Sequence, residues 1–260
     1  MGLDTRTLGL IATVIEHCEG PSERGPGHPP AETVRVLAAL RRFLREGTPW
    51  RSLRATSTQV SGSTLRRRLA DWAAINLLQR VHAVLVAMLR GHPDLILDSC
   101  SVRAKRGGEL TGPNPTDRGK KGSKHHAVVD AHGIPLAATV TAANTPDVKE
   151  LLEVVDQIPD VRGKPGRPRR RPEKLYGDRA YDSQAHREAL RGRGIEPKLA
   201  RRNTGHGSGL GVFRWVAEQF FSHLHRFRKL RLRTDWTLAA HDALLKLACS
   251  LICLNVLLSP

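Results

Sequence analysis

The spacing of apolar residues divides the chain into a helical first part and a longer second part that begins with strands. Across residues 31–46 apolar side chains recur at helical spacing, which predicts an amphipathic helix that ends at Gly47. The same period predicts a helix near residues 5–17 and another over residues 64–89, for which Ser61 is placed to supply an N-cap oxygen. The first part is therefore expected to be helical.

The segments between these helices predict a loop and one short turn. Residues 18–31 are rich in Gly, Pro and charge and should form a loop, whereas residues 50–55 are long enough for one more short helix. The order of helix, break and helix resembles a helix-turn-helix unit, whose second helix would begin with Arg66, Arg67 and Arg68. A plain helical bundle with a charged rim explains the same pattern.

The pattern changes near Asp94, where short apolar runs replace the helical period. Residues 95–97 are continuously apolar and lead into Asp98, as in a strand that is buried on both faces. Residues 125–130 and 134–141 read as two further strands, joined by a turn at His132 and Gly133. Three neighbouring strands are expected.

Strands and helices alternate through the rest of the chain. The expected elements are a helix from Thr145–Pro146 to Ile158, a strand over 174–177, a helix over 182–191, a strand over 195–199 and two helices to the end. Strands that first pair and later alternate with helices predict an α/β layer and not a bundle. We therefore expect a helical N-terminal region over residues 1–90 and an α/β domain over residues 91–260.

The most apolar run, residues 244–258, is interrupted by Lys246 and Asn255 and is short for a membrane span. It predicts a buried terminal helix and no membrane partner. Cys249 and Cys253 lie on this stretch and are expected to be buried small side chains. The four cysteines form no C-x-x-C pair and follow no secretory signal, so a reducing cytoplasm is the expected compartment.

The charge of the chain favours a polyanionic partner. Lys and Arg number 42 against 25 Asp and Glu, which gives a formal net charge of +17. Residues 161–171 hold six basic residues among glycines and prolines and should form an exposed loop. Nucleic acid is the first partner that such a charge indicates, although a basic solvated surface of the ribosomal or membrane-adjacent kind has the same composition.

Three acidic residues are candidates for catalysis. Asp98 ends the first buried strand, Asp178 follows the strand at 174–177, and Glu218 lies on a predicted helix. Carboxylate oxygens are the ligands that Mg²⁺ prefers, and two such ions about 4 Å apart can promote phosphoryl transfer. Structural roles are also open, because Asp98 could cap a turn, Asp178 could pair with Arg179 and Glu218 with Arg214.

The helix that carries Glu218 separates apolar from polar residues. Its expected apolar face consists of Phe213, Val216, Ala217, Phe220, Leu224 and Phe227. Its expected polar face consists of Arg214, Glu218, Ser222 and His225. A carboxylate and phosphate-binding groups would then share one surface. His125 and His126, in contrast, should point to opposite faces of a strand and cannot easily share one metal ion.

Five segments resemble the DDE transposases of bacterial insertion sequences, specifically the insertion-sequence-five group of the insertion-sequence-four-like superfamily. They are GTPWRSL (47–53), LILDSCSVRAKRGGE (95–109), the run at 112–147, LYGDRAYDS (175–183) and FRWVAEQFFSHLHRFRKLRLR (213–233). The likeness covers nearly the whole chain. It implies a ribonuclease H-like α/β catalytic domain that follows a helical, helix-turn-helix-like N-terminal domain.

The resemblance also implies which residues act. The acidic triad of the family matches Asp98 in LILDS, Asp178 in YGDRAYD and Glu218 in RWVAE, which leaves Asp182 as the expected N-cap of the next helix. These acids would hold two Mg²⁺ ions, for which Mn²⁺ would substitute. The expected activity is cleavage of DNA at the ends of an insertion sequence and strand transfer into target DNA.

The chain departs from the family's signature at two positions. The family usually has a tyrosine three residues before Arg214 and a lysine seven residues after the glutamate, where this sequence has Gly211 and His225. Arg226 and Lys229 lie nearby and are expected to take over the phosphate contact.

The resemblance and the charge together predict the DNA-contacting residues. The expected set is Arg66, Arg67, Arg68, Arg103, Lys105, Arg106, Lys120, Lys121, Lys124, Arg214, Arg226 and Lys229. The expected partners are the terminal inverted repeats of the element and target DNA, bound by a homodimer or larger assembly at the nucleoid. Two alternatives stay open: a DNA-binding regulator that no longer cuts, and a nuclease that hydrolyses without joining.

Overall fold

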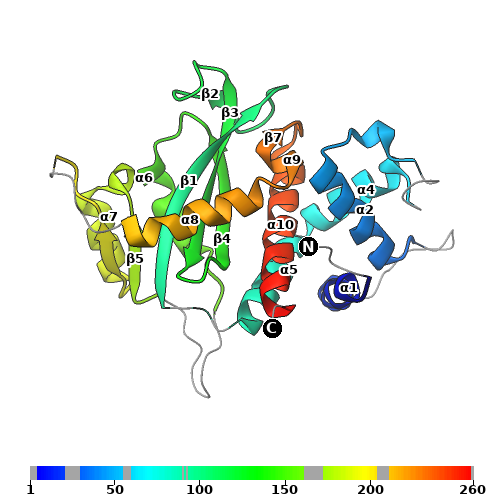
Figure 1. Ribbon diagram of the computed structural model, residues 1–260, viewed down its shortest axis with the longest axis horizontal. Helices are drawn as coiled ribbons and strands as arrows, with labels where there is room; N and C mark the ends of the chain where they lie inside the picture. Colours follow the sequence, from blue (N-terminus) through cyan, green and yellow to red (C-terminus); the bar gives the residue numbers. More distant parts are fainter. Residues whose placement is uncertain are drawn as a thin grey trace.

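The computed structural model describes residues 5–20, 30–54, 60–89, 91, 93–160, 172–203 and 211–258. A group of N-terminal helices lies on one side of the molecule and a mixed sheet on the other, with the last helix standing between them (Figure 1). The predicted loop at 161–171 and most of the loop predicted at 18–31 fall outside the described residues.

The N-terminal region is helical, as predicted. Its elements are α1 (Thr5–Glu19), α2 (Thr33–Glu46), the 3-10 turn η1 (Trp50–Ser52), α4 (Gly62–Ala74) and α5 (Leu77–Met88). Helix α2 ends at Gly47, whose φ of 68° is left-handed, and the Ser61 Oγ caps α4 by accepting from the Thr64 amide at 3.2 Å. The single helix predicted over residues 64–89 is wrong, because Asn76 adopts a left-handed φ of 50° and separates α4 from α5.

Within the described part of the chain, seven strands form one mixed sheet. They are β1 (Asp94–Ala104), β2 (Gly112–Pro113), β3 (Lys121–Asp130), β4 (Pro135–Ala142), β5 (Lys174–Gly177), β6 (Glu196–Leu199) and β7 (Leu232–Arg233). The five longer strands lie in the order β4-β3-β1-β5-β6; β3 is antiparallel to β1 and β4, while β5 and β6 run parallel to β1. This order gives the ribonuclease H-like sheet that the family resemblance implied, and its first three strands are the three expected neighbours.

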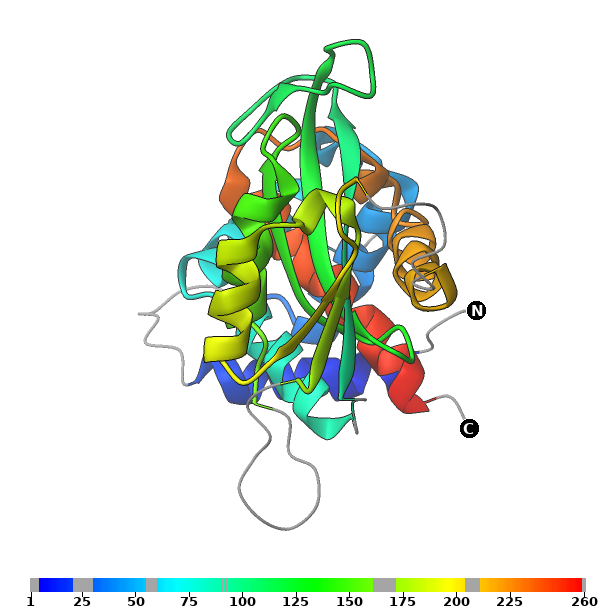
Figure 2. The ribbon, with the colours of Figure 1, turned by 90° about the vertical axis from the view of Figure 1, so that its left-hand side faces the viewer.

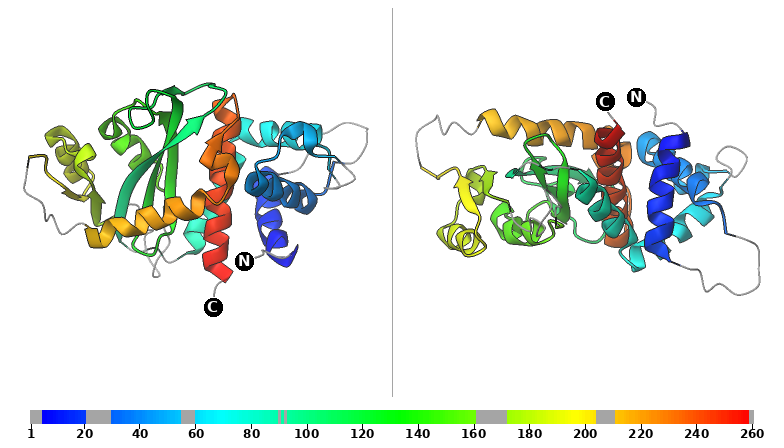
Figure 3. Two further views of the ribbon diagram at one scale, coloured as in Figure 1. Left: turned by 45° about the horizontal axis from the view of Figure 1, so that its top comes forward. Right: turned by 90° about the horizontal axis from the view of Figure 1, so that it is seen from below.

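Helices cover both faces of the sheet. Helices α6 (Asp147–Asp156) and α7 (Gln184–Gly192) lie on one face, and α8 (Gly211–Leu224) crosses the other (Figures 2 and 3). The chain then forms α9 (Arg228–Arg231), β7 and α10 (Leu238–Leu258), so the C-terminal part has one short helix and one short strand more than predicted.

Helix α10 joins the two parts of the molecule. It packs against α5 and α4 on one side and against β4 on the other, and one continuous hydrophobic core includes residues of both parts. Its length and composition would allow it to cross a membrane, but 67% of its most apolar window is buried within the protein. The predicted buried terminal helix is confirmed, and Cys249 and Cys253 are buried free thiols in it. The division of the chain at residue 90 stays a prediction.

Two helices begin later than expected. Pro146 occupies the N-cap position of α6, so this helix begins at Asp147 and not at Thr145–Pro146. Ser183 and not Asp182 occupies the N-cap position of α7. The Asp182 carboxylate instead accepts from the buried Arg187 guanidinium at 2.7 Å, because a charged group that loses its hydration requires an ionic partner.

Candidate active site

The pairing of β1 with β5 brings two of the predicted acids side by side. Ile96 is the register partner of Tyr176 in this parallel pair, and two residues further along each chain stand Asp98 and Asp178. Asp98 lies inside β1, which continues to Ala104 and does not end at Asp98 as predicted, whereas Asp178 directly follows β5 in an extended conformation. Because side chains of an extended chain alternate with a period of two, both aspartates project from the same face of the sheet. Both are half-buried.

Helix α8 brings the third acid to this face. Its Ala217, Phe220 and Leu224 are buried, which holds the helix against the sheet with Arg214 and Glu218 on its more exposed side. The Arg214 Nη2 lies 3.7 Å from the Glu218 Oε1, and the Glu218 side chain is 65% exposed. The predicted two-sided pattern of α8 is therefore confirmed for these residues.

Charge at the site is concentrated around Asp98. The pKa of Asp98 is raised to about 6, mainly by burial and to a smaller extent by the nearby carboxylates of Asp178 and Glu218, while the Ser99 amide and Arg214 act in the opposite direction. The Asp98 Oδ1 accepts from the Ser99 amide at 2.8 Å. A carboxylate in these surroundings gains from a nearby cation or proton.

Asp178 is fixed by its own backbone. Its Oδ1 accepts from the Ala180 amide at 2.8 Å, which caps the 3-10 turn η2 (Arg179–Tyr181). The turn holds one carboxylate oxygen and leaves the other for a ligand.

The three carboxylates could bind a hard divalent cation, although they do not surround it on all sides. Among the residues that the structure describes, no three acidic, histidine or cysteine side chains are placed to enclose a metal ion. Asp98, Asp178 and Glu218 nevertheless offer only carboxylate oxygens, and their mutual repulsion raises the Asp98 pKa. Mg²⁺ typically takes one or two carboxylates and completes its shell with water and substrate phosphates, which suits an open arrangement.

The predicted basic residues between β1 and β3 lie mostly at the surface. Those that are exposed are Arg103, Lys105, Arg106, Lys120 and Lys121. Lys124 differs, because its Nζ donates to the Asp147 Oδ1 at 2.8 Å and to the Thr145 carbonyl at 2.9 Å. The alternation along β3 turns Lys124 toward α6, where its charge is already neutralised.

The predicted DNA-contacting residues of α4 also divide into two kinds. Arg66 and Arg67 are exposed. The Arg68 guanidinium instead binds the Glu19 carboxylate at 2.9 Å and lies 5.3 Å from the Trp72 ring centroid, so it ties α4 to α1.

The two basic residues after α8 have different surroundings as well. Arg226 is exposed, whereas Lys229 is only 4% exposed. The Lys229 Nζ donates to the Thr234 Oγ1 at 3.0 Å and lies 4.2 Å from the Phe43 ring centroid. In this conformation Lys229 fastens α9 to α2 and does not present its charge to a phosphate.

A buried histidine cluster, which the sequence did not reveal, lies behind α8. The Nε2 atoms of His125 and His241 are 2.9 Å apart, and the His225 ring centroid is 6.3 Å from that of His125. Burial lowers the pKa of all three, so they are neutral near pH 7. His225 was predicted on the polar face with Glu218, but it follows the end of α8 and turns inward.

His126 points the other way from His125, as predicted. Its Nε2 is 2.8 Å from the Thr141 Oγ1, and its Nδ1 is 3.8 Å from the Asp147 Oδ1. The two neighbouring histidines therefore cannot serve one metal ion.

Known proteins share this arrangement of sequence and fold. The family model described as the transposase DDE domain matches residues 89–253. The putative transposase for insertion sequence element IS402 of Burkholderia cepacia is 50% identical over 194 residues, which are 73% of this chain and 91% of that protein. An uncharacterized 16.2 kDa protein of insertion element IS402, also from Burkholderia cepacia, is 31% identical over 118 residues, 44% of this chain and 80% of that protein.

Solved structures match the chain only loosely. A chain of the simian T-cell lymphotropic virus intasome in complex with PP2A regulatory subunit B56 gamma is 15% identical with a TM-score of 0.33, over 81% of this chain and 64% of that one. The Mos1 transposase in its paired-end complex is 15% identical with a TM-score of 0.28, over 91% of this chain and 82% of that one. The family model and the IS402 relative do not depend on these superpositions, and they show that the chain belongs to the DDE transposases, enzymes that transfer phosphoryl groups on DNA.

Proposed function

We propose that this transposase, a member of the insertion-sequence-five group, cuts DNA at the ends of its element and joins the freed ends to target DNA. Asp98, Asp178 and Glu218 are the proposed catalytic acids. The observation that supports this assignment is that Asp178, Glu218 and Arg214 all lie near enough to Asp98 to change its pKa, within the matched family domain.

DDE transposases use divalent metal ions, and the proposed ligands here are the same three carboxylates. Two Mg²⁺ ions, or Mn²⁺ in their place, would supply Lewis-acid activation of the attacking oxygen and stabilisation of the leaving one. The backbone contacts of Asp98 and Asp178 orient the carboxylates before substrate arrives. Such orientation matters because misplaced groups lose much of their catalytic effect.

The chain's own residues position the DNA for two successive displacements. Arg214 lies close enough to Glu218 and Asp98 to bind a phosphate oxygen at the same place. In the first displacement a water oxygen bonds to phosphorus and the 3′-oxygen leaves as a hydroxyl. In the second, that 3′-hydroxyl oxygen bonds to a phosphorus of target DNA and the 3′-oxygen of the target strand leaves as a hydroxyl, so no covalent protein intermediate forms.

The proposed DNA path follows the exposed basic residues. Arg66 and Arg67 on α4, the arginines and lysines of the β1–β3 connection, and Arg226 would contact phosphates without reading sequence. The net charge of +17 supports a strongly salt-dependent affinity for the terminal inverted repeats. Because two ends are joined in one event, the proposed assembly is a homodimer or larger, acting at the cytoplasmic nucleoid.

The decisive experiment is a cleavage assay on labelled DNA that carries the inverted repeats flanking the gene. The wild-type protein is expected to nick and join this DNA with Mg²⁺, and to do neither with EDTA or with Asp98→Asn in place of the wild type. Binding without cleavage by the wild-type protein would favour a regulator instead. Nicked products without joined products would favour a nuclease.

A further inference from the structure

A cavity of about 820 Å³ opens between the N-terminal helices and the segment that leads into α10. Residues of η1 and α4 line one wall, and Arg106 with residues 234–237 lines the other. The wall from η1 belongs to the segment GTPWRSL, which the catalytic site does not use. Trp236, at the mouth of this cavity, is 65% exposed.

Close contacts fix the main chain around Trp236. The Trp236 carbonyl accepts from the Glu109 amide at 2.9 Å, and the Leu238 amide donates to the Glu109 Oε2 at 2.7 Å. Gly108, with a φ of 123°, packs so closely that a Cβ there would lie 2.5 Å from the Trp236 carbonyl oxygen. These contacts fix the main chain of residue 236, and the exposed indole offers a flat apolar surface on which a planar ligand can stack.

Small and apolar side chains leave space beside this indole. Leu69, Ala73 and Ala240 line the cavity, and Trp50 forms part of the wall. The Trp50 ring is itself fixed, because it stacks on Phe43 with ring centroids 3.7 Å apart. The interior therefore suits an aromatic ring system.

The rim of the cavity is positively charged. Arg51, Arg66 and Arg106 line it, and all three are exposed. Asp235 is the acidic residue in the lining, and it is 6% exposed with its Oδ2 3.6 Å from the His241 Nδ1. A ligand in this cavity meets apolar side chains and three exposed arginines, which complements a base flanked by phosphates.

We propose that this cavity binds an unpaired nucleotide of DNA, with its base stacked on Trp236 and its flanking phosphates held by Arg51, Arg66 and Arg106. The inference rests on the proposed function, because it assumes that this face meets DNA. Paired bases present only their edges and cannot stack on an indole, so the site selects DNA that is locally opened. Base stacking on an aromatic side chain tolerates any base, so selection is by structure and not by sequence.

The test compares two synthetic hairpin DNAs that differ by one unpaired thymidine, each labelled with fluorescein. Affinities for the full-length protein are measured by fluorescence anisotropy at one salt concentration, because phosphate contacts depend on salt. The wild type is expected to prefer the hairpin with the unpaired thymidine. Trp236→Ala should reduce that preference by about 5- to 100-fold, while Trp236→Phe should keep most of it.

Trp215→Ala is the matched control, because it removes a tryptophan that is 53% exposed and lies outside the cavity lining. The preference of this variant should equal that of the wild type. As a second readout, 5-iodouracil at the unpaired position should crosslink to Trp236 on irradiation, with the site identified by mass spectrometry. This readout uses the wild-type protein and is therefore independent of how the variants fold.

Three results would overturn the inference while leaving the proposed function intact: equal binding of both hairpins by the wild type, an unchanged preference in Trp236→Ala, or a crosslink elsewhere. If Trp236→Ala kept the preference but lost self-association in sedimentation, the cavity would be a contact between copies. If the wild type bound neither hairpin, the proposed DNA-binding function itself would fail.

Discussion

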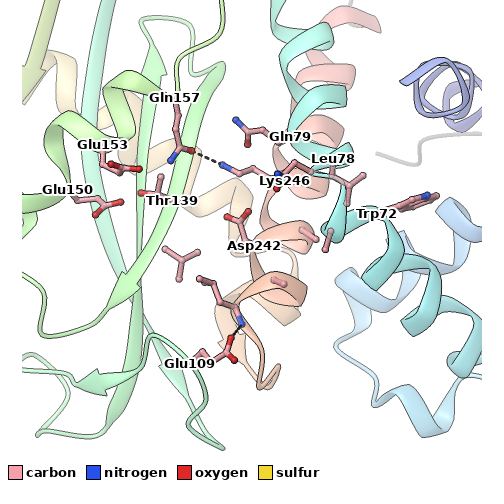
Figure 4. A pocket seen from close by; sticks show the side chains of 16 residues that line it. Trp72, Leu78, Gln79, Glu109, Thr139, Glu150, Glu153, Gln157, Asp242 and Lys246 are labelled. Atoms are coloured by element: carbon pink, nitrogen blue, oxygen red, sulfur yellow. Dashed lines mark hydrogen bonds between the residues drawn. The ribbon is translucent and has the colours of Figure 1, made fainter. Parts of the chain in front are cut away.

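This protein has two groups of aspartates and glutamates that come from separate parts of the chain. The two groups differ in their surroundings. Asp98, Asp178 and Glu218 lie on the face of the sheet that α8 crosses. The second group lines a cavity of about 690 Å³ between α6 and α10 and consists of Glu109, Glu150, Glu153 and Asp242 (Figure 4).

Each group contains one aspartate whose pKa is raised by burial, and the neighbours of that aspartate distinguish the two sites. Around Asp98, two further carboxylates add to the rise. Around Asp242, the neighbouring Lys246 and His241 lower the pKa instead. Acidic residues that gather near one another thus serve structure where a cation of the protein neutralises them, and are candidates for catalysis where repulsion persists.

The largest expected difference concerns cleavage of element-end DNA. Asp98→Asn removes a proposed metal ligand and should lower the rate by on the order of 10³-fold or more. Asp242→Asn makes the same chemical change in the other group and should keep the rate within about threefold of wild type. Initial nicking rates, measured after circular dichroism has verified the fold of both variants, provide the check. Equal losses of nicking rate in the two variants would contradict the assignment of catalysis to the first group alone.

The next prediction concerns the cation inside the second group. Lys246 is 3% exposed, and its ammonium donates to the Ala138 carbonyl and to the Gln157 Oε1. Lys246→Met should lower the free energy of unfolding by about 2–4 kcal/mol, because it removes a donor from a buried carbonyl and the cation beside Asp242. Urea denaturation measures the change.

A double variant tests the pairing directly. If Lys246 stabilises the protein partly by neutralising Asp242, the combined Lys246→Met and Asp242→Asn protein should be more stable than the two single changes predict by addition. Strict additivity would mean that the two charges are independent.

As pH falls, titration of Asp98 in the first group should lower the cleavage rate but increase the stability of the protein. Below the Asp98 pKa of about 6 the carboxylate becomes protonated, so the cleavage rate should fall about tenfold for each unit of pH. Stability should move the other way: the folded-state pKa lies above the unfolded-state value, so the folded protein binds more protons between them. Lowering the pH from about 6 toward 4 therefore increases the contribution of Asp98 to stability.

The Asp98→Asn variant separates this effect from other titrations. Thermal unfolding of both proteins, followed across this pH range without divalent cation, should show a difference in Tm that favours the variant and shrinks as pH falls. A constant difference across the range would mean that Asp98 does not titrate near 6.

Much of the fold, and the position of the acids, could be predicted from the sequence. The strand at residues 174–177 was placed correctly, and the apolar face of α8 was recognised from its period. These features depend on apolar residues that recur every two residues in a strand or every three to four residues in a helix. Asp98 and Asp178 meet because of the β1–β5 register, a long-range pairing that only the family resemblance indicated.

The basic residues were harder to predict, for a physical reason. The identity of a lysine or arginine does not show whether its side chain faces solvent or a partner inside the protein. Lys124, Arg68 and Lys229 all bind partners inside the protein. Their partners Asp147, Glu19 and Phe43 are distant in sequence. The histidine cluster was missed for the same reason, since its members come from three elements.

The smallest expected effect concerns the outer carboxylates of the second group. Changing both Glu150 and Glu153 to Gln raises the formal net charge from +17 to +19, because 17 plus the two removed negative charges is 19. If this cavity lies away from DNA, the affinity should change by less than about twofold and the slope of log K against log salt should stay constant. If DNA passed close to α6, removing two repulsive charges would strengthen binding mainly at low salt, where screening is weakest. The salt titration therefore distinguishes a general gain in net charge from a local contact, and with it whether only the α8 face meets the substrate.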